Sequence, residues 1–580
     1  MTALHWNELL SPDAGAPLAA ALAEYARPRR WFRAKGRESR AARLRDLIAL
    51  DGSNLLVILE MEFVTGDNEL YAIPIAPVDE LARRRAAGEG TAAPPDRIGG
   101  GTGSDGLIDG LLVPGQAAEA LLNLMRGGGR LRGRLGGELV AEALPALAAV
   151  LGDGDGQTLP PAKIPRVEQT NSIAIFGEQA LLKVYRQLTV GPNPEQEVGA
   201  FLNTHCDPPC APRVLGALTY RGADGDSLSL AIAHEYLSNE GDAFSFVLGK
   251  LRAYFERVST LPPPVSGVAR SGGRLSRALD GAAGRPSALG PGAVNALAVF
   301  GPLGARLGQR TGELHRALSS AAPNERDFVP EPLTAGDRAA LADRAEGMLR
   351  EQLDGLSAAL PNLSAAARLL AERLLGAEAR RAISAQLAEF RQRPLAVVKT
   401  RTHGDLHLGQ VLVRGDDFVI IDFEGEPARP LAERRAKGSP LRDVMGMVRS
   451  FDYAPEVLLR DPAFLEEHGG SDAETWRVRM QPWADLWKET MTTAYLRAYL
   501  DAVGEARFLP LTATGASAVN RDDLSLLMTF YELEKVIYEI GYEVNNRPDW
   551  VEIPLRGLAA LVGVGARNDG GADDAAGGAR

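Results

Sequence analysis

The stretch that most limits how this chain can fold runs from residue 401 to residue 426 and reads "RTHGDLHLGQVLVRGDDFVIIDFEGE". It contains two apolar runs, "QVLV" and "FVIID", joined by the turn sequence "RGDD". Apolar runs of this length on either side of such a turn predict a β-hairpin. A hairpin here brings Asp405, Gln410 and Asp422 together, and only a fold with a polar loop ahead of a short strand pair can accommodate it.

The side chains of this hairpin match the needs of phosphoryl transfer. That reaction needs a carboxylate to accept the substrate hydroxyl proton and oxygen ligands to hold magnesium against the nucleotide phosphates. We expect Asp405 to be the base, Gln410 and Asp422 to be the magnesium ligands, and Glu424 to assist a second ion. The alternative is an ordinary polar hairpin, and the regular spacing of these groups argues against it.

Two histidines in the same stretch, His403 and His407, also invite a metal site. Histidine sites for transition metals need a third ligand and a supporting outer shell, and neither is evident after His407. We expect hydrogen bonds that brace the loop.

A kinase also needs a cation near the phosphates, and Lys183 in "ALLKVYR" meets this need. The run "VEQTNSIAIF" and the run that carries Lys183 are separated by a short turn, which predicts a second hairpin. A helix is expected to begin near "PNPEQEVGAFL" and to supply a carboxylate to the lysine. Of Glu195 and Glu197, we choose Glu197, because it shares a helix face with Val198 and nearby apolar residues.

Two further segments complete the expected nucleotide site. The turn "EQTNS" offers Thr170, Asn171 and Ser172 to the phosphates. The buried strand "LSLAIAHEYL" ends in an extended segment whose backbone groups, at Glu235 and Leu237, could pair with an adenine edge. A plain connector is the alternative for that segment.

The chain of 580 residues is too long for one core, so we expect two or three structural units. Strand-like runs, a turn-rich linker near residue 155 and a change to helical periodicity predict an α+β unit at 1–155, a unit with the Lys183 hairpin, and hence the expected nucleotide site, at 156–240, and a mainly helical unit at 241–564. The Gly/Ala/Pro-rich stretch 265–295 is expected to be a flexible insertion, and 565–580 a disordered tail. Within the first unit, Trp31 and Phe32 of "RRWFRAKGRE" are expected to pack a surface turn, and an anion site at this aromatic and basic cluster is the alternative.

Charge and composition exclude several classes of partner. The net charge of -11 repels phosphate backbones and anionic lipid, so we expect neither a nucleic acid nor a membrane as partner. The N-terminus has no signal-peptide pattern and no apolar run long enough to span a bilayer, which favours a cytoplasmic protein. The two cysteines, Cys206 and Cys210, are expected to be reduced thiols, because a structural zinc needs four ligands.

Several motifs, in order from residue 30 to residue 550, resemble the bacterial maltokinases. They include "RWFRAKGR", "EQTNS", "LLKVYRQL", "HGDLHLGQVL", "YELEKVIYEIGYEVNNRPDW" and, most specific of all, "DFEGEPARPLAERR". The resemblance implies a bilobal, protein-kinase-like fold of the aminoglycoside-phosphotransferase type, with an N-terminal cap. It also implies the roles given above for Lys183, Glu197, Asp405, Gln410 and Asp422.

By this resemblance the chain would transfer the γ-phosphate of ATP, with Mg²⁺, to O1 of maltose. Maltose 1-phosphate would then feed α-glucan and glycogen synthesis from trehalose, with trehalose synthase as a further partner. The sugar site would include His403 and His407 with Lys535, Tyr538 and Tyr542, the last three lying on one face of a predicted helix. A surface helix whose tyrosines cover the core is the alternative for that face.

Two other functions stay open. A neighbouring family with the same fold phosphorylates glucosamine, and sugar discrimination depends on pocket contacts that the sequence underdetermines. A function of another class is a catalytically silent nucleotide-binding module that docks to trehalose synthase, and the presence of Lys183, Asp405, Gln410 and Asp422 argues against it.

Overall fold

The computed structural model describes residues 15–78, 97–99, 106–112, 117–152, 158–165, 170–264, 289–512 and 519–564. The chain forms two compact units: the first combines residues 1–238 with 423–435, and the second combines residues 239–422 with 436–580. The predicted tail at 565–580 and most of the predicted insertion at 265–295 lie outside the described residues. The described end of that insertion forms helix α8 (Pro291–Leu297).

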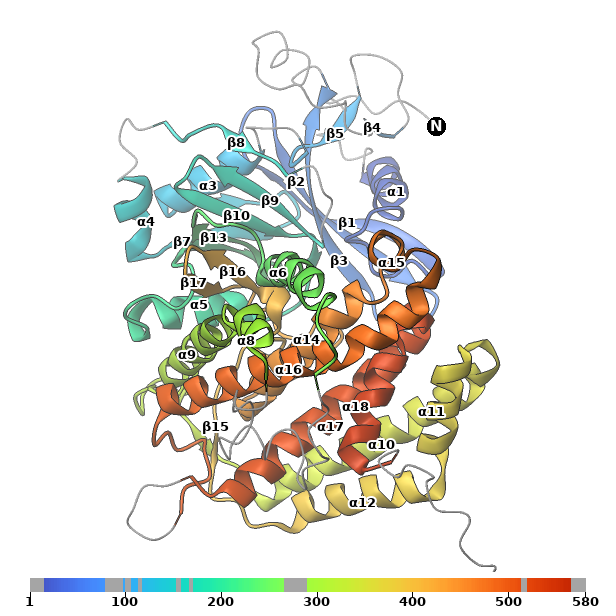
Figure 1. Cartoon of the computed structure of the whole chain (residues 1–580). Coiled ribbons are helices and arrows are strands. Elements are labelled where there is room, and N and C mark those ends of the chain that lie inside the picture. The colour runs from blue at the N-terminus through green and yellow to red at the C-terminus, as the bar shows by residue number, and fades with distance from the viewer. Residues whose placement is uncertain are drawn as a thin grey trace, which may run out of the picture. The chain divides into compact units, whose positions relative to one another are not determined.

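A six-stranded antiparallel sheet makes up one part of the first unit (Figure 1). Its strands are β1 (Ser39–Ala49), β2 (Leu55–Phe63), β3 (Glu69–Pro77), β4 (Arg97–Ile98), β5 (Leu107–Asp109) and β11 (Gln187–Leu188). Helix α1 (Gly15–Ala26) packs against apolar side chains of this sheet. Trp31 and Phe32, each of which is 3% exposed, belong to the same core. The packing role predicted for this aromatic pair is therefore confirmed.

A seven-stranded antiparallel sheet makes up the other part of the first unit, in the order β6-β7-β12-β13-β10-β9-β8. Its strands are β6 (Arg130–Arg132), β7 (Glu138–Ala143), β8 (Ala162–Lys163), β9 (Asn171–Phe176), β10 (Ala180–Tyr185), β12 (Val214–Arg221) and β13 (Ser227–Glu235). The predicted hairpin around Lys183 is confirmed as β9 and β10. Strand β7 pairs with β12, so the boundary predicted near residue 155 falls inside one sheet.

Four helices complete the first unit: α3 (Ala117–Gly127), α4 (Pro145–Leu151), α5 (Pro194–His205) and α13 (Leu431–Arg435). Helix α5 begins where the sequence predicts, because Asn193 caps it by accepting a hydrogen bond from the Glu195 backbone N–H at 2.9 Å. Cys206 follows this helix and forms a disulfide bond with Cys210, so the expectation of reduced thiols is wrong. Their separation of four residues lets the chain turn back far enough to join them.

Arg186 links the two sheets of the first unit. It lies between β10 and β11, and its guanidinium is fully buried and pairs with Asp109 at 2.8 Å. Its backbone oxygen accepts a hydrogen bond from Ala72 in β3, while its Nε donates to Ser172 in β9. A buried charge with a carboxylate and several acceptors around it is satisfied, and breaking such a pair is costly.

The second unit is mainly helical, with two short strand pairs. Its helices are α6 (Ala243–Val258), α8, α9 (Phe300–Leu318), α10 (Ala335–Ala359), α11 (Ala365–Leu375), α12 (Ala377–Gln392), α14 (Leu441–Leu458), α15 (Pro462–Gly469), α16 (Ala473–Val503), α17 (Arg521–Asn546) and α18 (Glu552–Val562). Its strand pairs are β14 (Glu331–Pro332) with β15 (Val398–Lys399), and β16 (Val411–Arg414) with β17 (Asp417–Ile420). The hairpin predicted from the 401–426 stretch is thus confirmed as β16 and β17.

Helices α9 and α16 lie side by side in the second unit (Figure 1). Glycines at intervals of four residues, Gly304, Gly308 and Gly312, form the face of α9 that meets α16. A Cβ atom at Gly308 would collide with the backbone carbonyl of Tyr495, so the backbones approach too closely for any side chain there. This close packing places His315, at the end of α9, against Tyr499 of α16.

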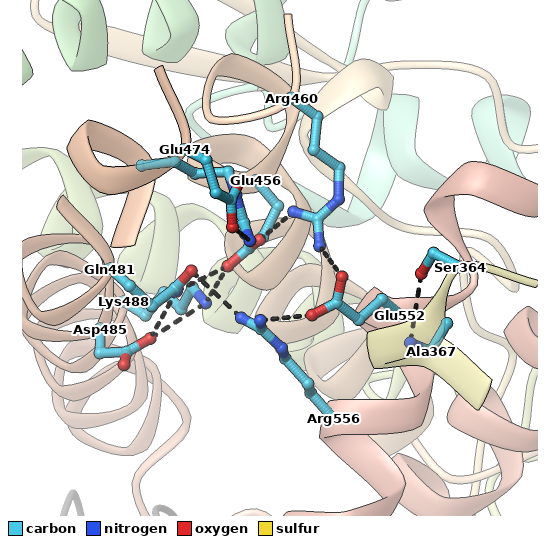
Figure 2. A network of polar contacts seen from close by, with 11 residues as sticks. Ser364, Ala367, Glu456, Arg460, Glu474, Gln481, Asp485, Lys488, Glu552 and Arg556 are labelled. Carbon is cyan, nitrogen blue, oxygen red and sulfur yellow. Dashed lines mark hydrogen bonds and ion pairs between the residues drawn. The ribbon is translucent and has the colours of Figure 1, made fainter. Parts of the chain in front are cut away.

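A buried ionic network joins α14, α16 and α18 (Figure 2). Glu456, 2% exposed, accepts hydrogen bonds from Lys488 at 3.0 Å and from Gln481 at 2.9 Å, and it also pairs with Arg460. Arg460 pairs in turn with Glu552 at 3.1 Å. Burial works to raise the pKa of the Glu456 carboxyl, but the charges of Lys488 and Arg460 hold that pKa below its usual value. Glu456 thereby connects α14 to α16, and Arg460 extends the network to α18.

Among the described residues, no helix combines the length and the apolar character that crossing a bilayer requires.

The close approach at Gly308 predicts a large effect of a small change. Gly308→Ala is expected to lower the free energy of unfolding by about 1–3 kcal/mol, because the added methyl meets the Tyr495 carbonyl. Gly347→Ala in α10 is the matched control, since open space surrounds that position. The control is expected to be stabilised by about 0.5–1 kcal/mol through helix propensity. Chemical denaturation of both variants measures the two shifts, and equal shifts would contradict the packing argument.

Candidate functional site

Lys183 is the central cation of the first unit's candidate site. It lies on β10, a strand paired on both sides, and is only 8% exposed. Its Nζ contacts Glu195 Oε2 at 2.8 Å and Glu424 Oε1 at 2.5 Å. A compact ammonium group between two carboxylates is held in one place.

Glu195, rather than the predicted Glu197, is the α5 carboxylate that pairs with Lys183. Glu195 also accepts a hydrogen bond from Tyr185 Oη at 2.9 Å, and His234 Nε2 lies 3.3 Å from its other oxygen. Burial works to raise the pKa of this carboxyl, but Lys183 and His234 hold it well below its usual value. The carboxylate is therefore ionised in the folded protein.

The choice of Glu197 was wrong because of its position on the helix. Glu195 lies three residues before Val198 and seven before Leu202, so all three share the buried face of α5. Glu197 instead forms a two-bonded pair with Arg435, at 2.7 and 2.8 Å. The same spacing rule, applied from Val198 backwards, finds Glu195.

The predicted phosphate-covering residues lie at the start of β9. Asn171 donates from Nδ2 to Glu424 Oε1 at 2.8 Å, and Ser172 Oγ accepts from Arg186 Nε at 2.7 Å. Thr170 lines a cavity next to them. These contacts place Asn171 beside the Lys183 cluster, and its role toward phosphates stays a prediction.

The predicted adenine segment follows β13. Glu235 ends this strand, and its carboxylate pairs with Arg213 at 2.7 and 2.9 Å. Its backbone N–H donates to Arg213 O, and the next N–H, at Tyr236, donates to Gln179 O. The first two N–H groups are therefore used within the unit, and Leu237 follows them in the chain.

In the second unit, a buried carboxylate that we did not predict as a site residue holds the 401–405 loop. Asp443 in the first turn of α14 accepts hydrogen bonds from the backbone N–H groups of His403 at 2.8 Å and Gly404 at 2.9 Å. His315 Nε2 lies 3.1 Å from the same carboxylate, and His315 Nδ1 lies 3.0 Å from Tyr499 Oη. Burial works to raise the pKa of Asp443, but the hydrogen bond from His315 and the loop N–H groups lower it below its usual value.

In the sequence, Asp443 stands in "SPLRD", which reads as a cap followed by a first helical turn, where an aspartate commonly forms helix-end charge pairs. The structure shows that its carboxylate points into the protein and is 2% exposed. The signal that could have identified it is the surrounding sequence, "LRDVMGMV", which is mostly apolar. An aspartate is rarely buried among apolar residues unless it has ionic or hydrogen-bond partners.

The two histidines of the loop have different surroundings. His403 is 1% exposed, its Nε2 lies 2.8 Å from Ile421 O, and its Nδ1 accepts from the Asp405 N–H at 3.3 Å. Both ring nitrogens of His403 thus brace the loop, as one of the two expectations for it states, and its role toward sugar stays a prediction. His407 caps a short 3₁₀ turn, η5 (Leu408–Gln410), by accepting from the Gly409 N–H at 3.0 Å. Burial lowers the pKa of His407, which keeps it neutral near pH 7.

Asp405, the predicted base, is partly exposed at the end of this braced loop. Lys535 Nζ of α17 lies 3.5 Å from its Oδ1. The loop and the helix are therefore brought together as predicted, and the carboxylate of Asp405 faces a cation.

The predicted magnesium ligands also come together. Gln410 Nε2 lies 3.0 Å from Asp422 Oδ2, because the β16–β17 hairpin brings its two ends together. Among the described residues other than glycine, Asp422 alone has a left-handed backbone, with φ of 67°. Aspartate tolerates that conformation better than most residues, and such positions concentrate at functional sites. Here the amide nitrogen of Gln410 faces the carboxylate, so the binding of Mg²⁺ by oxygen atoms of Gln410 and Asp422 stays a prediction.

Helix α17 presents aromatic groups beside Lys535. Lys535 Nζ lies 5.2 Å from the ring centroid of Tyr538, and the rings of Tyr538 and Tyr542 stack with centroids 6.4 Å apart. Tyr542 is 45% exposed. An exposed aromatic face next to a charged group is a surface that sugar rings can stack on and bond to.

Comparisons with known proteins agree on the type of fold. Residues 262–479 match the phosphotransferase enzyme family, APH. A solved glucosamine kinase structure is similar over 97% of this chain and 99% of its own, with a TM-score of 0.56 and 20% identity. A glucosamine kinase structure in complex with glucosamine, ADP and inorganic phosphate gives a TM-score of 0.56 over 97% of this chain, with 20% identity. Residues 262–479 are thus similar to the APH family, and the chain shares the fold of these glucosamine kinase structures. The predicted α+β, kinase-like fold is therefore confirmed.

Two curated relatives are also glucosamine kinases. The one from Streptacidiphilus jiangxiensis is 28% identical over 262 residues, which cover 44% of this chain and 49% of that protein. The alignment thus spans about half the length of that relative. The one from Mycolicibacterium smegmatis is 25% identical over 401 residues, 69% of this chain and 79% of that protein.

The pairing of Lys183 can be tested by comparing two glutamates of the same helix. Glu195→Gln is expected to lower kcat/KM for ATP by about tenfold or more, because the lysine loses a charged partner. Glu197→Gln is the matched control, since its partner is Arg435. Steady-state kinetics with varied ATP measure both, and a larger loss in the Glu197 variant would contradict the pairing.

The buried carboxylate of Asp443 predicts a pH-dependent stability. Its folded pKa is lowered, so its contribution is present above about pH 4, the ordinary pKa of aspartate, and is lost as the pH falls through the folded pKa. Asp443→Asn is expected to lower the free energy of unfolding at pH 7 by about 2–4 kcal/mol.

Denaturant unfolding of the Asp443 variant and the unmodified chain at several pH values tests this. The difference between them is expected to narrow below about pH 4. The control is Asp416→Asn in the exposed turn of the hairpin, which is expected to shift little at any pH. A difference that stays constant down to low pH would contradict the ionised state of Asp443.

Proposed function

We propose that this protein is an ATP-dependent sugar kinase that phosphorylates maltose at O1. In this proposal Lys183 binds the nucleotide phosphates, and Glu195 and Glu424 hold the lysine in place. Gln410 and Asp422 bind Mg²⁺, which neutralises charge on the transferred phosphoryl group. Asp405 accepts the proton of the sugar hydroxyl as that oxygen attacks the γ-phosphate.

The observation that favours maltose over an amino sugar is the position of Lys535. Its ammonium group lies 3.5 Å from the proposed base, where the reacting hydroxyl would bind. A second ammonium group, as on glucosamine, would be attracted by the Asp405 carboxylate but would have to compete for it with Lys535, and like charges at such distances are unfavourable. A neutral sugar can accept a hydrogen bond from Lys535 and stack on Tyr538 or Tyr542.

Glucosamine is the second candidate acceptor, because the curated relatives and the similar structures are glucosamine kinases. A silent nucleotide-binding module is the candidate of another class. Association with trehalose synthase and a role in α-glucan and glycogen synthesis are parts of the maltose proposal. So is a cytoplasmic location, where ATP is available; the Cys206–Cys210 disulfide would be unusual there.

The test is magnesium-dependent ADP release with maltose, with glucosamine, with glucose and with no sugar. Turnover is expected with maltose, and Asp405→Asn is expected to lower kcat by about 100-fold or more, because the proton acceptor is lost. Asp416→Asn, in the exposed turn of the same hairpin, is the matched control and is expected to keep activity.

Each other outcome has a definite meaning. Preference for glucosamine would keep the mechanism and replace the substrate. Full activity of the Asp405 variant would remove the base assignment. Thermal stabilisation by ATP without ADP release with any of the sugars would favour the silent module.

A further inference from the structure

The first unit contains a polar cavity next to the Lys183 cluster. It has a volume of about 50 Å³ and lies where β9 and β10 meet the connector into α5 and helix α13. A single water needs about 10–15 Å³ of such volume, so a compact polyatomic ion fits. The residues that line it include Arg33, Asn171, Tyr185, Asn193, Glu424 and Arg434.

Two guanidinium groups line this cavity, and the described part of the chain offers them carbonyl oxygens as hydrogen-bond partners. Arg434 Nη1 donates to the backbone oxygen of Glu424 at 3.1 Å, and Arg33 Nη1 donates to Pro427 O at 3.4 Å. Among the described residues, Arg434 Nε is buried and has no hydrogen-bond partner. Carbonyl oxygens satisfy single N–H groups but do not neutralise the charge, so the cavity holds excess positive charge.

The third charged residue of the cavity is already paired. The Glu424 carboxylate binds Lys183 Nζ at 2.5 Å and Asn171 Nδ2 at 2.8 Å. Burial lowers the pKa of the Arg434 guanidinium; Glu424 opposes this, and the nearby charge of Arg33 adds to the lowering. Two like charges facing one space are relieved by an anion placed between them.

We propose that this cavity binds a small oxyanion with two negative charges, such as inorganic phosphate. The planar guanidinium forks of Arg33 and Arg434 match the oxygen spacing of a tetrahedral oxyanion. The buried Nε of Arg434 gains an acceptor, and the Gln187 amide and Thr189 hydroxyl on the cavity wall add neutral donors. Lys183, to which the proposed function assigns the nucleotide phosphates, does not line this cavity, but Thr170 and Asn171 of the turn predicted to cover those phosphates do. The proposal is that the oxyanion binds independently of the nucleotide, and it does not depend on the protein being a kinase.

The experiment titrates the full-length chain with potassium phosphate by calorimetry, with ionic strength held constant by chloride. One saturable site is expected. Arg33→Gln and Arg434→Gln are each expected to weaken it by about tenfold or more, because each removes a charge-assisted hydrogen bond. Arg33 is exposed, so its variant tests the site without disturbing the core.

Lys35→Gln is the matched control, because Lys35 is an exposed cation two residues from Arg33 that does not line the cavity. Its phosphate affinity is expected to equal that of the unmodified chain. Equal weakening in this variant would show diffuse attraction to positive charge and would overturn the proposal. Absence of saturable binding to the unmodified chain would mean that the cavity holds water only, and would also overturn it.

A second titration, with ADP and magnesium present at saturation, separates this site from the nucleotide site. Phosphate affinity that is unchanged by ADP is expected. Phosphate binding that ADP abolishes would assign the anion to the nucleotide site and overturn the proposal. Sugar kinase activity is measured separately, so its failure leaves the outcome of these titrations unaffected.

Discussion

The carboxylate of Asp443 is the interaction on which the candidate catalytic loop depends. It is buried, it accepts the N–H groups of two successive loop residues, and His315 lies against it. His315 reaches it because glycines of α9 let that helix approach α16 closely. The packing of α9 against α16 thereby helps to fix the position of the loop that carries Asp405. A positioned base loses little freedom on reaction, which is how a fold contributes to rate.

Several other buried charges are also paired with charges of opposite sign. In the first unit Arg186 pairs with Asp109 where the two sheets meet, and Lys183 pairs with Glu195 and Glu424. In the second unit Glu456 pairs with Lys488 of α16 and with Arg460, which follows α14. Removing one member of such a set leaves an uncompensated buried charge, so each set fixes the elements that supply it. The cavity with Arg33 and Arg434 departs from this pattern.

Local patterns predicted the local structure. Both hairpins, the α5 helix and the closeness of Gln410 to Asp422 follow from alternation, turn residues and strand ends, which depend on neighbours in sequence. Two errors were local: the choice of Glu197 over Glu195 on α5, and the expectation that Cys206 and Cys210 are reduced. Other features depend on contacts between distant segments. The boundary predicted near residue 155 separates β7 from β12, two strands that pair in one sheet, and no local pattern encodes that pairing. Likewise, Asp443 looked like a helix-end charge until α9, α14 and the loop were seen to meet at its carboxylate.

The segment with the most specific resemblance to the maltokinases supplies several members of the polar contacts in the first unit. Within "DFEGEPARPLAERR", Glu424 binds Lys183, Arg434 binds the Glu424 backbone and Arg435 binds Glu197. These contacts position the groups proposed to bind nucleotide, so similarity in this segment reflects a shared phosphate chemistry. Under the proposed function, the choice of sugar would depend instead on α17, where Lys535 lies beside Asp405. The argument for a neutral acceptor in that proposal therefore rests on the charge that α17 supplies, and the shared motif does not bear on it.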